Sequence, residues 1–152
     1  MADVARAAGV GVGTVYRHFT SREALIEAAA EQRFAEILEY ARTDCRHGTT
    51  SGTALERYLR HVGEVLSSDR GLSAAVLSAM GSSAPRGDTL ARLADAVAEL
   101  IESDRAAGGL RTDVTVGDVY MMVGGLSGII RTGSGDWRRF LDLAFQGLLP
   151  RA

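Results

Sequence analysis

Four side chains that can hydrogen-bond to DNA follow a cluster of glycines near the N-terminus. The stretch AGVGVGTVYRHFTSREAL (residues 8–25) contains Thr14, Tyr16, Arg17 and His18. Hydroxyl, guanidinium and imidazole groups contact phosphate oxygens and base edges when one helix face presents them to a DNA groove. The three glycines beside them are also typical of a second kind of site, a loop that binds nucleotide phosphates, and this alternative must be considered.

The glycine spacing does not fit a phosphate-binding loop. Dinucleotide-binding loops follow a strand and have the spacing G-x-G-x-x-G, and nucleoside triphosphate loops end in Gly-Lys-Ser/Thr. Here the preceding residues ADVARAA have helical character, the spacing is G-x-G-x-G, and the chain contains no lysine. We therefore exclude both kinds of loop.

A helix-turn-helix unit fits these residues better. Ala5 is small where a second helix must cross closely, and Gly9 can take the left-handed conformation that ends a first helix. Val10 is expected to fill the angle between the helices, and Val15 and Phe19 to point inward from the second helix. In such units the second helix lies in the major groove. The outer face of that helix carries Gly13, Thr14, Tyr16, Arg17 and His18.

A helix-start signal follows the second helix. Thr20 or Ser21 can cap a long helix from Arg22 to about Cys45, with Glu23 placed for a capping box behind Thr20. The backbone N–H groups of its first turn and the charge of Arg22 suit a DNA phosphate. The alternative interpretation of the whole segment is a tight helical corner that binds no ligand.

Helical spacing of apolar residues continues along the chain and predicts an all-α fold of about seven to nine helices. We expect two parts. Residues 1–45 form a DNA-binding segment with its connecting helix, and residues 46–152 form a helical ligand-binding and dimerisation domain. A polar loop, RHGTTSG, separates them, and Asp88 is expected to cap a later helix. The further helices are predicted over residues 55–68, 72–80, 88–107, 116–131 and 137–148.

Composition limits the class of protein. The chain of 152 residues is 46% hydrophobic with a net charge of −2, so it can bury a core and any basic surface must be local. The single cysteine excludes a disulfide framework. The lack of a signal peptide or a long apolar run indicates a cytoplasmic protein without membrane association. Cys45, His47 and His61 lie in no catalytic or metal-binding pattern, so we expect no enzyme activity, metal or cofactor.

A pocket for an unknown, mainly apolar small molecule is expected among the helices of the C-terminal part. Spaces between bundled helices are common ligand sites, and Met and Tyr side chains suit an adaptable pocket. For each residue the alternative interpretation is ordinary core packing. The candidate lining residues are Tyr58, Val62, Leu66, Leu77, Met80, Val97, Ile101, Tyr120, Met121 and Trp137.

The segment VYMMVGGLSGIIRTG (residues 119–133) suits contact with a second copy of the chain. Gly124 and Gly128 share one helix face and would let another helix approach closely. Close packing inside one subunit is the alternative, but together with the last helix we expect a two-fold four-helix interface. Its candidate residues are Gly124, Leu126, Gly128, Ile129, Ile130, Phe140, Leu141 and Leu148.

The N-terminal stretch ADVARAAGVGVGTVYRHFTSREAL resembles the DNA-binding motif of the TetR family of bacterial transcriptional regulators. That pattern runs I/V-A-x-x-A-G-V-x-x-G-T-L/V-Y-x-x-F, then Ser/Thr, Lys/Arg-Glu and a leucine, and the match covers residues 4–25. LacI-type regulators open with a related pattern, but they continue into a large α/β domain whose strands are not predicted here. The TetR resemblance implies operator binding by a homodimer that pairs through its last two helices.

Carried over residue by residue, the resemblance assigns roles within the motif. It implies that Val12, Gly13 and Thr14 lie at the groove-facing start of the recognition helix and that Arg17 lies near bases or backbone. Direct readout would depend on Thr14, Tyr16 and Arg17, because Val12 and Gly13 offer few hydrogen bonds to base edges. The resemblance places the remaining phosphate contacts at Tyr16, His18, Ser21 and Arg22.

Members of that family usually begin with a further helix, preceded by a basic arm, which packs across the two helices of the motif. This sequence opens with the first helix of the motif already running, so the inner faces of Val4, Ala8, Val15 and Phe19 would lack a partner. We therefore expect weak or absent DNA binding by the chain as it stands, either through truncation or through a late-assigned start.

The sequence thus predicts a TetR-type regulator, of the repressor kind, that a small-molecule ligand releases from its operator. The alternative is a dimeric ligand-binding or interaction protein that has lost DNA binding.

Overall fold

The computed structural model describes residues 1–43, 53–82 and 84–150, and over these residues the chain forms eight helices and no strands. This confirms the all-α prediction. The polar loop RHGTTSG, Cys45 and His47 lie outside the described residues. The helices are α1 (Ala2–Ala7), α2 (Val12–His18), α3 (Arg22–Arg42), α5 (Ala54–Ser68), α6 (Arg70–Met80), α7 (Gly87–Ala106), α8 (Val116–Thr132) and α9 (Trp137–Gln146).

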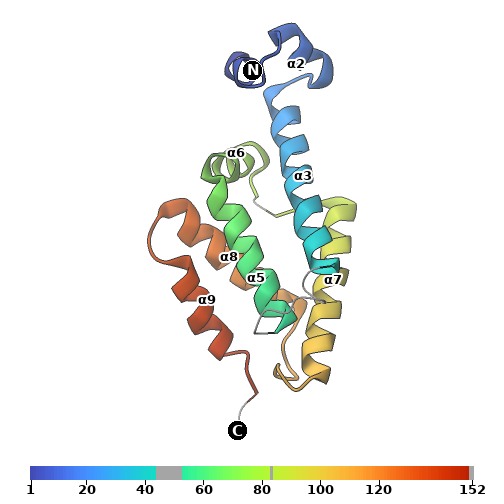
Figure 1. The fold of residues 1–152 in the computed structure, drawn as a ribbon, viewed down its shortest axis with the longest axis vertical. Helices are drawn as coiled ribbons and strands as arrows, with labels where there is room; N and C mark the ends of the chain where they lie inside the picture. The colour runs from blue at the N-terminus through green and yellow to red at the C-terminus, as the bar shows by residue number, and fades with distance from the viewer. Residues whose placement is uncertain (44–52, 83, 151–152) are drawn as a thin grey trace.

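Two short helices project from one end of the molecule. Figure 1 shows α1 and α2 beyond the helical body, at the N-terminal end of the long helix α3. The remainder of α3 descends into the body, where it packs against α5, α6 and α7. The long helix therefore joins the N-terminal corner to the rest of the chain.

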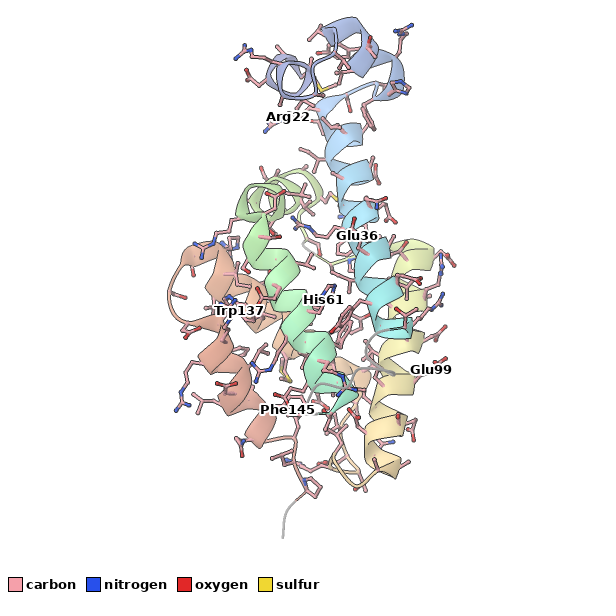
Figure 2. All side chains as sticks on the ribbon, in the orientation of Figure 1. Arg22, Glu36, His61, Glu99, Trp137 and Phe145 are labelled. Atoms are coloured by element: carbon pink, nitrogen blue, oxygen red, sulfur yellow. The ribbon has the colours of Figure 1, made fainter. Side chains whose placement is uncertain are left out.

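Helix α5 lies at the centre of the body and contacts α3, α6, α7, α8 and α9. Its inward residues recur at helical spacing, and Leu55 and Leu59 have no solvent exposure at all. On the side facing α9, a glycine replaces a side chain: a Cβ on Gly63 would lie 2.6 Å from Cε3 of Trp137. The indole ring therefore occupies the space that Gly63 leaves, and this contact seats α9 on the central helix (Figure 2).

Helix starts in the body depend on polar side chains, as the orphan N–H groups of a first turn require. The buried carboxylate of Asp104, on α7, accepts hydrogen bonds from the N–H groups of Ala54 (2.9 Å) and Leu55 (2.8 Å) and so ties α7 to the start of α5. The predicted cap at Asp88 is wrong. Helix α7 begins one residue earlier, at Gly87, and Asp88 lies in its first turn.

A buried arginine connects α3 to α6. Arg33 is only 8% exposed. Its Nη1 donates to Ser73 Oγ (2.9 Å) and its Nη2 to the Asp69 carbonyl (3.1 Å), with the Asp69 carboxylate 3.8 Å away. Burial lowers the pKa of the Arg33 guanidinium, and Asp69 opposes that shift. This contact, the Arg33 clasp, fixes the middle of α3 to the first turn of α6.

Candidate nucleic-acid interface and ligand cavity

The turn between α1 and α2 depends on one glycine. Gly9 has φ of +67°, a conformation that side-chain-bearing residues rarely adopt. Its N–H bonds to the Arg6 carbonyl (3.2 Å), and the next N–H, of Val10, bonds to the Ala5 carbonyl (3.0 Å). These bonds satisfy the end of α1 and reverse the chain into α2. Ala5 and Val15 are the buried residues of the two helices, at 3% and 6% exposure.

The outer face of α2 presents the predicted polar set to solvent. Tyr16 is 50% exposed, and Arg17 and His18 are also exposed. Thr14 is half-buried, and its Oγ1 accepts a hydrogen bond of 3.2 Å from Arg17 Nη2. The helix thus gathers hydroxyl, guanidinium and imidazole groups on one surface. Gly13 is also exposed, and nothing lies within 4 Å of where its Cβ would be.

The start of α3 adds two further candidate phosphate contacts. Ser21 caps the helix, because its Oγ accepts a hydrogen bond of 3.0 Å from the Ala24 N–H. A cap at Ser21 moves Glu23 one position too early for a capping box, so the box predicted from Thr20 does not form. Arg22 is exposed in the first turn, and Figure 2 shows it directly below the α1–α2 corner.

The corner leaves much apolar surface uncovered. Val4, Val10 and Val12 are 41%, 44% and 42% exposed. The prediction that Val10 fills the angle between the helices is therefore wrong: the crossing is close enough for Ala5 and Val15 to fill it. Of the other residues expected to face inward, Ala8 is exposed and Phe19 is half-buried.

A cavity of about 250 Å³ lies within the helical body, where four helices approach one another. Helix α3 contributes Phe34 and Ile37, and the remaining walls come from α5, α7, α8 and the connection before α7. Its side chains are apolar except for the hydroxyl groups of two tyrosines and one serine. The other lining residues are Tyr58, Val62, Leu66, Ala84, Pro85, Leu90, Leu93, Tyr120, Val123, Gly124 and Ser127.

The structure brings together some of the predicted pocket residues and separates others. Tyr58, Val62, Leu66 and Tyr120 line this cavity. Val97 and Ile101 lie in the core instead, and Trp137 packs on α5. The remaining three predicted residues lie outside the cavity as well: Leu77 and Met80 are half-buried on α6, and Met121 is 70% exposed.

Sequence reasoning missed two cavity residues on the connecting helix. Phe34 and Ile37 recur at helical spacing in the long helix predicted from Arg22, so the sequence identifies them as residues of its buried face. A stripe identifies the buried face but not whether a side chain or an empty space lies opposite it. The connection before α7 offers one signal in the sequence, the apolar residue Pro85 within a predicted loop. The structure buries this residue against the cavity.

The residues predicted for a dimer interface divide into core and surface. Leu126, Ile130 and Leu141 are at most 2% exposed, so they pack inside one subunit and do not form its surface. Phe140 is half-buried against Gly125. Ile129 and Leu148 are half-buried against the core, Gly124 is exposed, and Gly128 is half-buried.

An apolar surface remains on the outer side of α8 and α9. Met121 and Leu143 are 70% and 58% exposed, the two most exposed large hydrophobic side chains of the described residues. Nothing lies within 4 Å of where a Cβ on Gly124 or Gly128 would be. We call these four residues the α8–α9 face. It combines exposed apolar side chains with room for the close approach of a helix.

No other described group suggests chemistry. Within residues 1–43, 53–82 and 84–150, no three His, Cys, Asp or Glu side chains cluster as metal ligands, and no helix is long and apolar enough to cross a membrane. The His61 ring stacks on Tyr40, with 3.7 Å between ring centres. A larger hollow of about 770 Å³ lies near Thr53, lined in part by the charged residues Arg57 and Glu102, and we assign no site to it.

A helical corner with the helix-turn-helix arrangement, a long connecting helix and an apolar cavity are together the features expected of a transcriptional regulator. Comparison with protein families agrees. Residues 1–29 match the family "Bacterial regulatory proteins, tetR family", and residues 50–150 match "Transcriptional regulator SbtR-like, C-terminal domain". The chain belongs to the TetR family of bacterial transcriptional regulators. This confirms the resemblance that the N-terminal motif carries.

Solved structures support the same assignment. The TetR transcriptional regulator SCO0520 from Streptomyces coelicolor is 33% identical, with a TM-score of 0.68 over 98% of this chain and 86% of its own. A TetR regulatory protein from Mycobacterium vanbaalenii is 30% identical, with a TM-score of 0.68 over 97% and 81%. A structure described as "Molecular basis for control of antibiotic production by a bacterial hormones" shares the fold at 22% identity, with a TM-score of 0.69 over 96% and 84%. Comparison with curated proteins gave no match.

Proposed function

We propose that this regulator is a homodimeric repressor that a small molecule, bound in the cavity between α3, α5, α7 and α8, releases from its operator. One observation supports this proposal above the others. The helix that begins beside the recognition helix α2 also supplies Phe34 and Ile37 to the cavity wall. A ligand that contacts these residues acts on the element that carries the DNA-binding corner.

The outer face of α2 would enter the major groove. In this arrangement Thr14, Tyr16 and Arg17 read base edges, since Val12 and Gly13 present almost no hydrogen-bonding atoms. Phosphate contacts then fix the register without reading sequence. The proposed phosphate contacts are Tyr16, His18, Ser21 and Arg22.

A second copy of the chain would cover the α8–α9 face. Exposed apolar side chains beside open glycines suit a two-fold helical interface. Such a dimer carries two recognition helices to half-sites separated by about one helical turn of DNA or a multiple of it. The proposed site of action is operator DNA in the cytoplasm.

Release requires two states of the dimer that differ in the separation of the recognition helices. Without ligand the dimer favours the separation that fits the operator. The ligand favours the other separation, and it shifts the balance by no more than its own difference in affinity for the two states. In this scheme the chain has a binding role and catalyses no reaction.

The test is fluorescence anisotropy of labelled DNA taken from around the protein's own gene, titrated with protein at two salt concentrations. We expect Arg17→Ala to weaken specific binding by roughly 1–3 kcal/mol if Arg17 contacts a base, or to reduce the salt slope by about one if it contacts a phosphate. Arg92→Ala is the matched control, because it removes the same charge from an exposed site on α7. Equal loss in both variants would contradict the assigned interface.

The uncovered valines of the corner favour one other function. Val4, Val10 and Val12 are each more than 40% exposed, so α1 and α2 bury little apolar surface. If the chain lacks specific DNA binding, the second candidate is a dimeric ligand-binding protein. The same titration, repeated with a protein that carries the residues encoded by any upstream in-frame codons, separates the two candidate functions. Specific DNA binding by the extended protein alone supports the regulator. Lack of specific DNA binding by both proteins supports the ligand-binding protein.

A further inference from the structure

One buried hydroxyl in the cavity lacks a partner. Tyr120, on α8, lines the cavity, and its Oη is buried without a hydrogen bond to any residue that the structure describes. Leaving a buried hydroxyl unpaired costs free energy, which a partner would restore. Burial raises the pKa of the Tyr120 phenol, so it stays protonated at neutral pH. The hydroxyl is therefore a hydrogen-bond donor without an acceptor among the described residues.

The remaining walls exclude charge. None of the thirteen lining residues is Asp, Glu, Arg or His, and the polar side-chain groups are the hydroxyls of Tyr58, Tyr120 and Ser127. An ion placed there would lose its hydration without gaining an opposite charge, which costs far more than burying a neutral polar group. The cavity therefore suits a neutral molecule.

The volume limits the size of that molecule. The cavity measures about 250 Å³. An apolar cavity of about 150 Å³ holds benzene, and sites for drug-sized ligands run from about 300 Å³ upward. A single substituted ring or a short branched chain fits between these limits.

The lining residues also indicate a route of entry. Most of them are buried or half-buried, but Ala84, Leu90 and Gly124 are exposed. Ala84 and Leu90 mark the mouth of the cavity, beside the start of α7, whereas Gly124 belongs to the α8–α9 face. In this inference a neutral ligand enters from this side, beside Leu90.

We propose that the cavity binds a small, neutral, mainly apolar molecule that carries one hydrogen-bond acceptor oxygen, and that the Tyr120 hydroxyl donates to that oxygen. This proposal rests on the proposed function in one respect: both take the cavity as the ligand site. It does not depend on DNA release.

The test compares three probes of similar size: acetophenone, with a carbonyl acceptor; ethylbenzene, with none; and benzoate, an anion. Their affinities are measured by protein NMR titration without DNA, for the wild type, Tyr120→Phe and Tyr40→Phe. Tyr40→Phe is the matched control, since Tyr40 lies outside this cavity. We expect the wild type to prefer acetophenone over ethylbenzene by roughly three- to tenfold, as one neutral hydrogen bond gives, and to bind benzoate more weakly than either.

Tyr120→Phe should abolish the preference for acetophenone, and Tyr40→Phe should keep it. Leu90→Trp, at the exposed mouth, should weaken both neutral probes without changing their ratio, which places them in this cavity. Five outcomes would each overturn the proposal. The wild type could bind the two neutral probes equally, bind benzoate most tightly, or bind no probe. The preference for acetophenone could survive in Tyr120→Phe, or Leu90→Trp could leave the affinities of both neutral probes unchanged. If the probes bind as expected but do not change the affinity of the protein for operator DNA, release by a ligand is contradicted. The proposed specificity of the cavity then still holds.

Discussion

The N-terminal corner and the helical body reach their structures by different means. In the corner, α1 and α2 bury Ala5 and Val15, while the nearby Val4 and Val10 remain more than 40% exposed. In the body, Leu55 and Leu59 have no solvent exposure, and the helix that carries them, α5, contacts α3, α6, α7, α8 and α9. Local backbone chemistry therefore has a larger share in shaping the corner, whereas apolar burial holds the body together.

Removing the same kind of side chain from the two regions should give the largest difference. We expect Leu59→Ala to destabilise the protein by about 2–5 kcal/mol, because it leaves a cavity in a fully buried core. Val10→Ala should change the free energy of unfolding by less than about 0.5 kcal/mol, because that side chain is 44% exposed. Urea unfolding at one protein concentration measures both. Equal effects would contradict the contrast between the regions.

Glycines inside helices provide a second, smaller contrast. Gly63→Ala should destabilise by about 1–3 kcal/mol, since its new methyl group would overlap the Trp137 ring and push α9 from α5. Gly13→Ala should be neutral or stabilise by up to about 1 kcal/mol, since its Cβ meets nothing within 4 Å and alanine favours helix. Thermal unfolding with tryptophan fluorescence reports both the stability and the environment of the only tryptophan. A stable Gly63→Ala with unchanged fluorescence would show that the ring contact is dispensable.

The smallest expected effect is a difference in the pH dependence of stability between a charged helix cap and an uncharged one. At the start of α8, Asp118 Oδ2 accepts from Thr115 Oγ1 (2.7 Å) and N (2.8 Å), and these bonds hold the pKa of the Asp118 carboxyl below its usual range. The unfolded carboxyl titrates near pH 4. The stability that this cap contributes is therefore complete above about pH 4 and is lost as pH falls through the lower folded pKa.

Chemical denaturation across acidic pH measures this loss. Asp118→Asn should be less stable than the wild type near neutral pH, and the difference should shrink as the pH falls below about 4. The Ser21 cap of α3 carries no charge, so Ser21→Ala should be destabilising by a nearly constant amount over the same range. A pH-independent effect of Asp118→Asn would contradict the role of the carboxylate.

The helices could be predicted from sequence because their apolar residues recur at helical spacing, and the corner because Gly9 and its neighbours form a specific motif. Boundaries were less accurate. Asp88 is a good cap residue, yet α7 starts at Gly87, whose φ of +55° is a conformation that glycine adopts readily. A cap signal places a helix start to within a residue or two.

The cavity was predictable only in part. Tyr58 and Tyr120 line it as expected, whereas Val97 belongs to the core although its position on an apolar stripe is equivalent. Spacing along one helix indicates which side is buried, but a cavity arises where several helices fail to fill a space. The wall contributed by Phe34 depends on the relative placement of α3 and α8, which no single stretch of sequence encodes.

The Arg33 clasp gives α3 the geometry of a lever. The clasp holds the helix about halfway along its length, eleven residues after Arg22. A helix rises by about 1.5 Å per residue, so the start of α3 lies roughly 17 Å from the clasp. Between these points Ile26 and Ala30 are buried against the body, so a tilt would slide this half of the helix over its neighbours. Phe34 follows the pivot directly and faces the cavity. A tilt of about ten degrees at this pivot would carry the start of α3, and the corner attached to it, through about 3 Å, close to the spacing of successive base pairs along DNA.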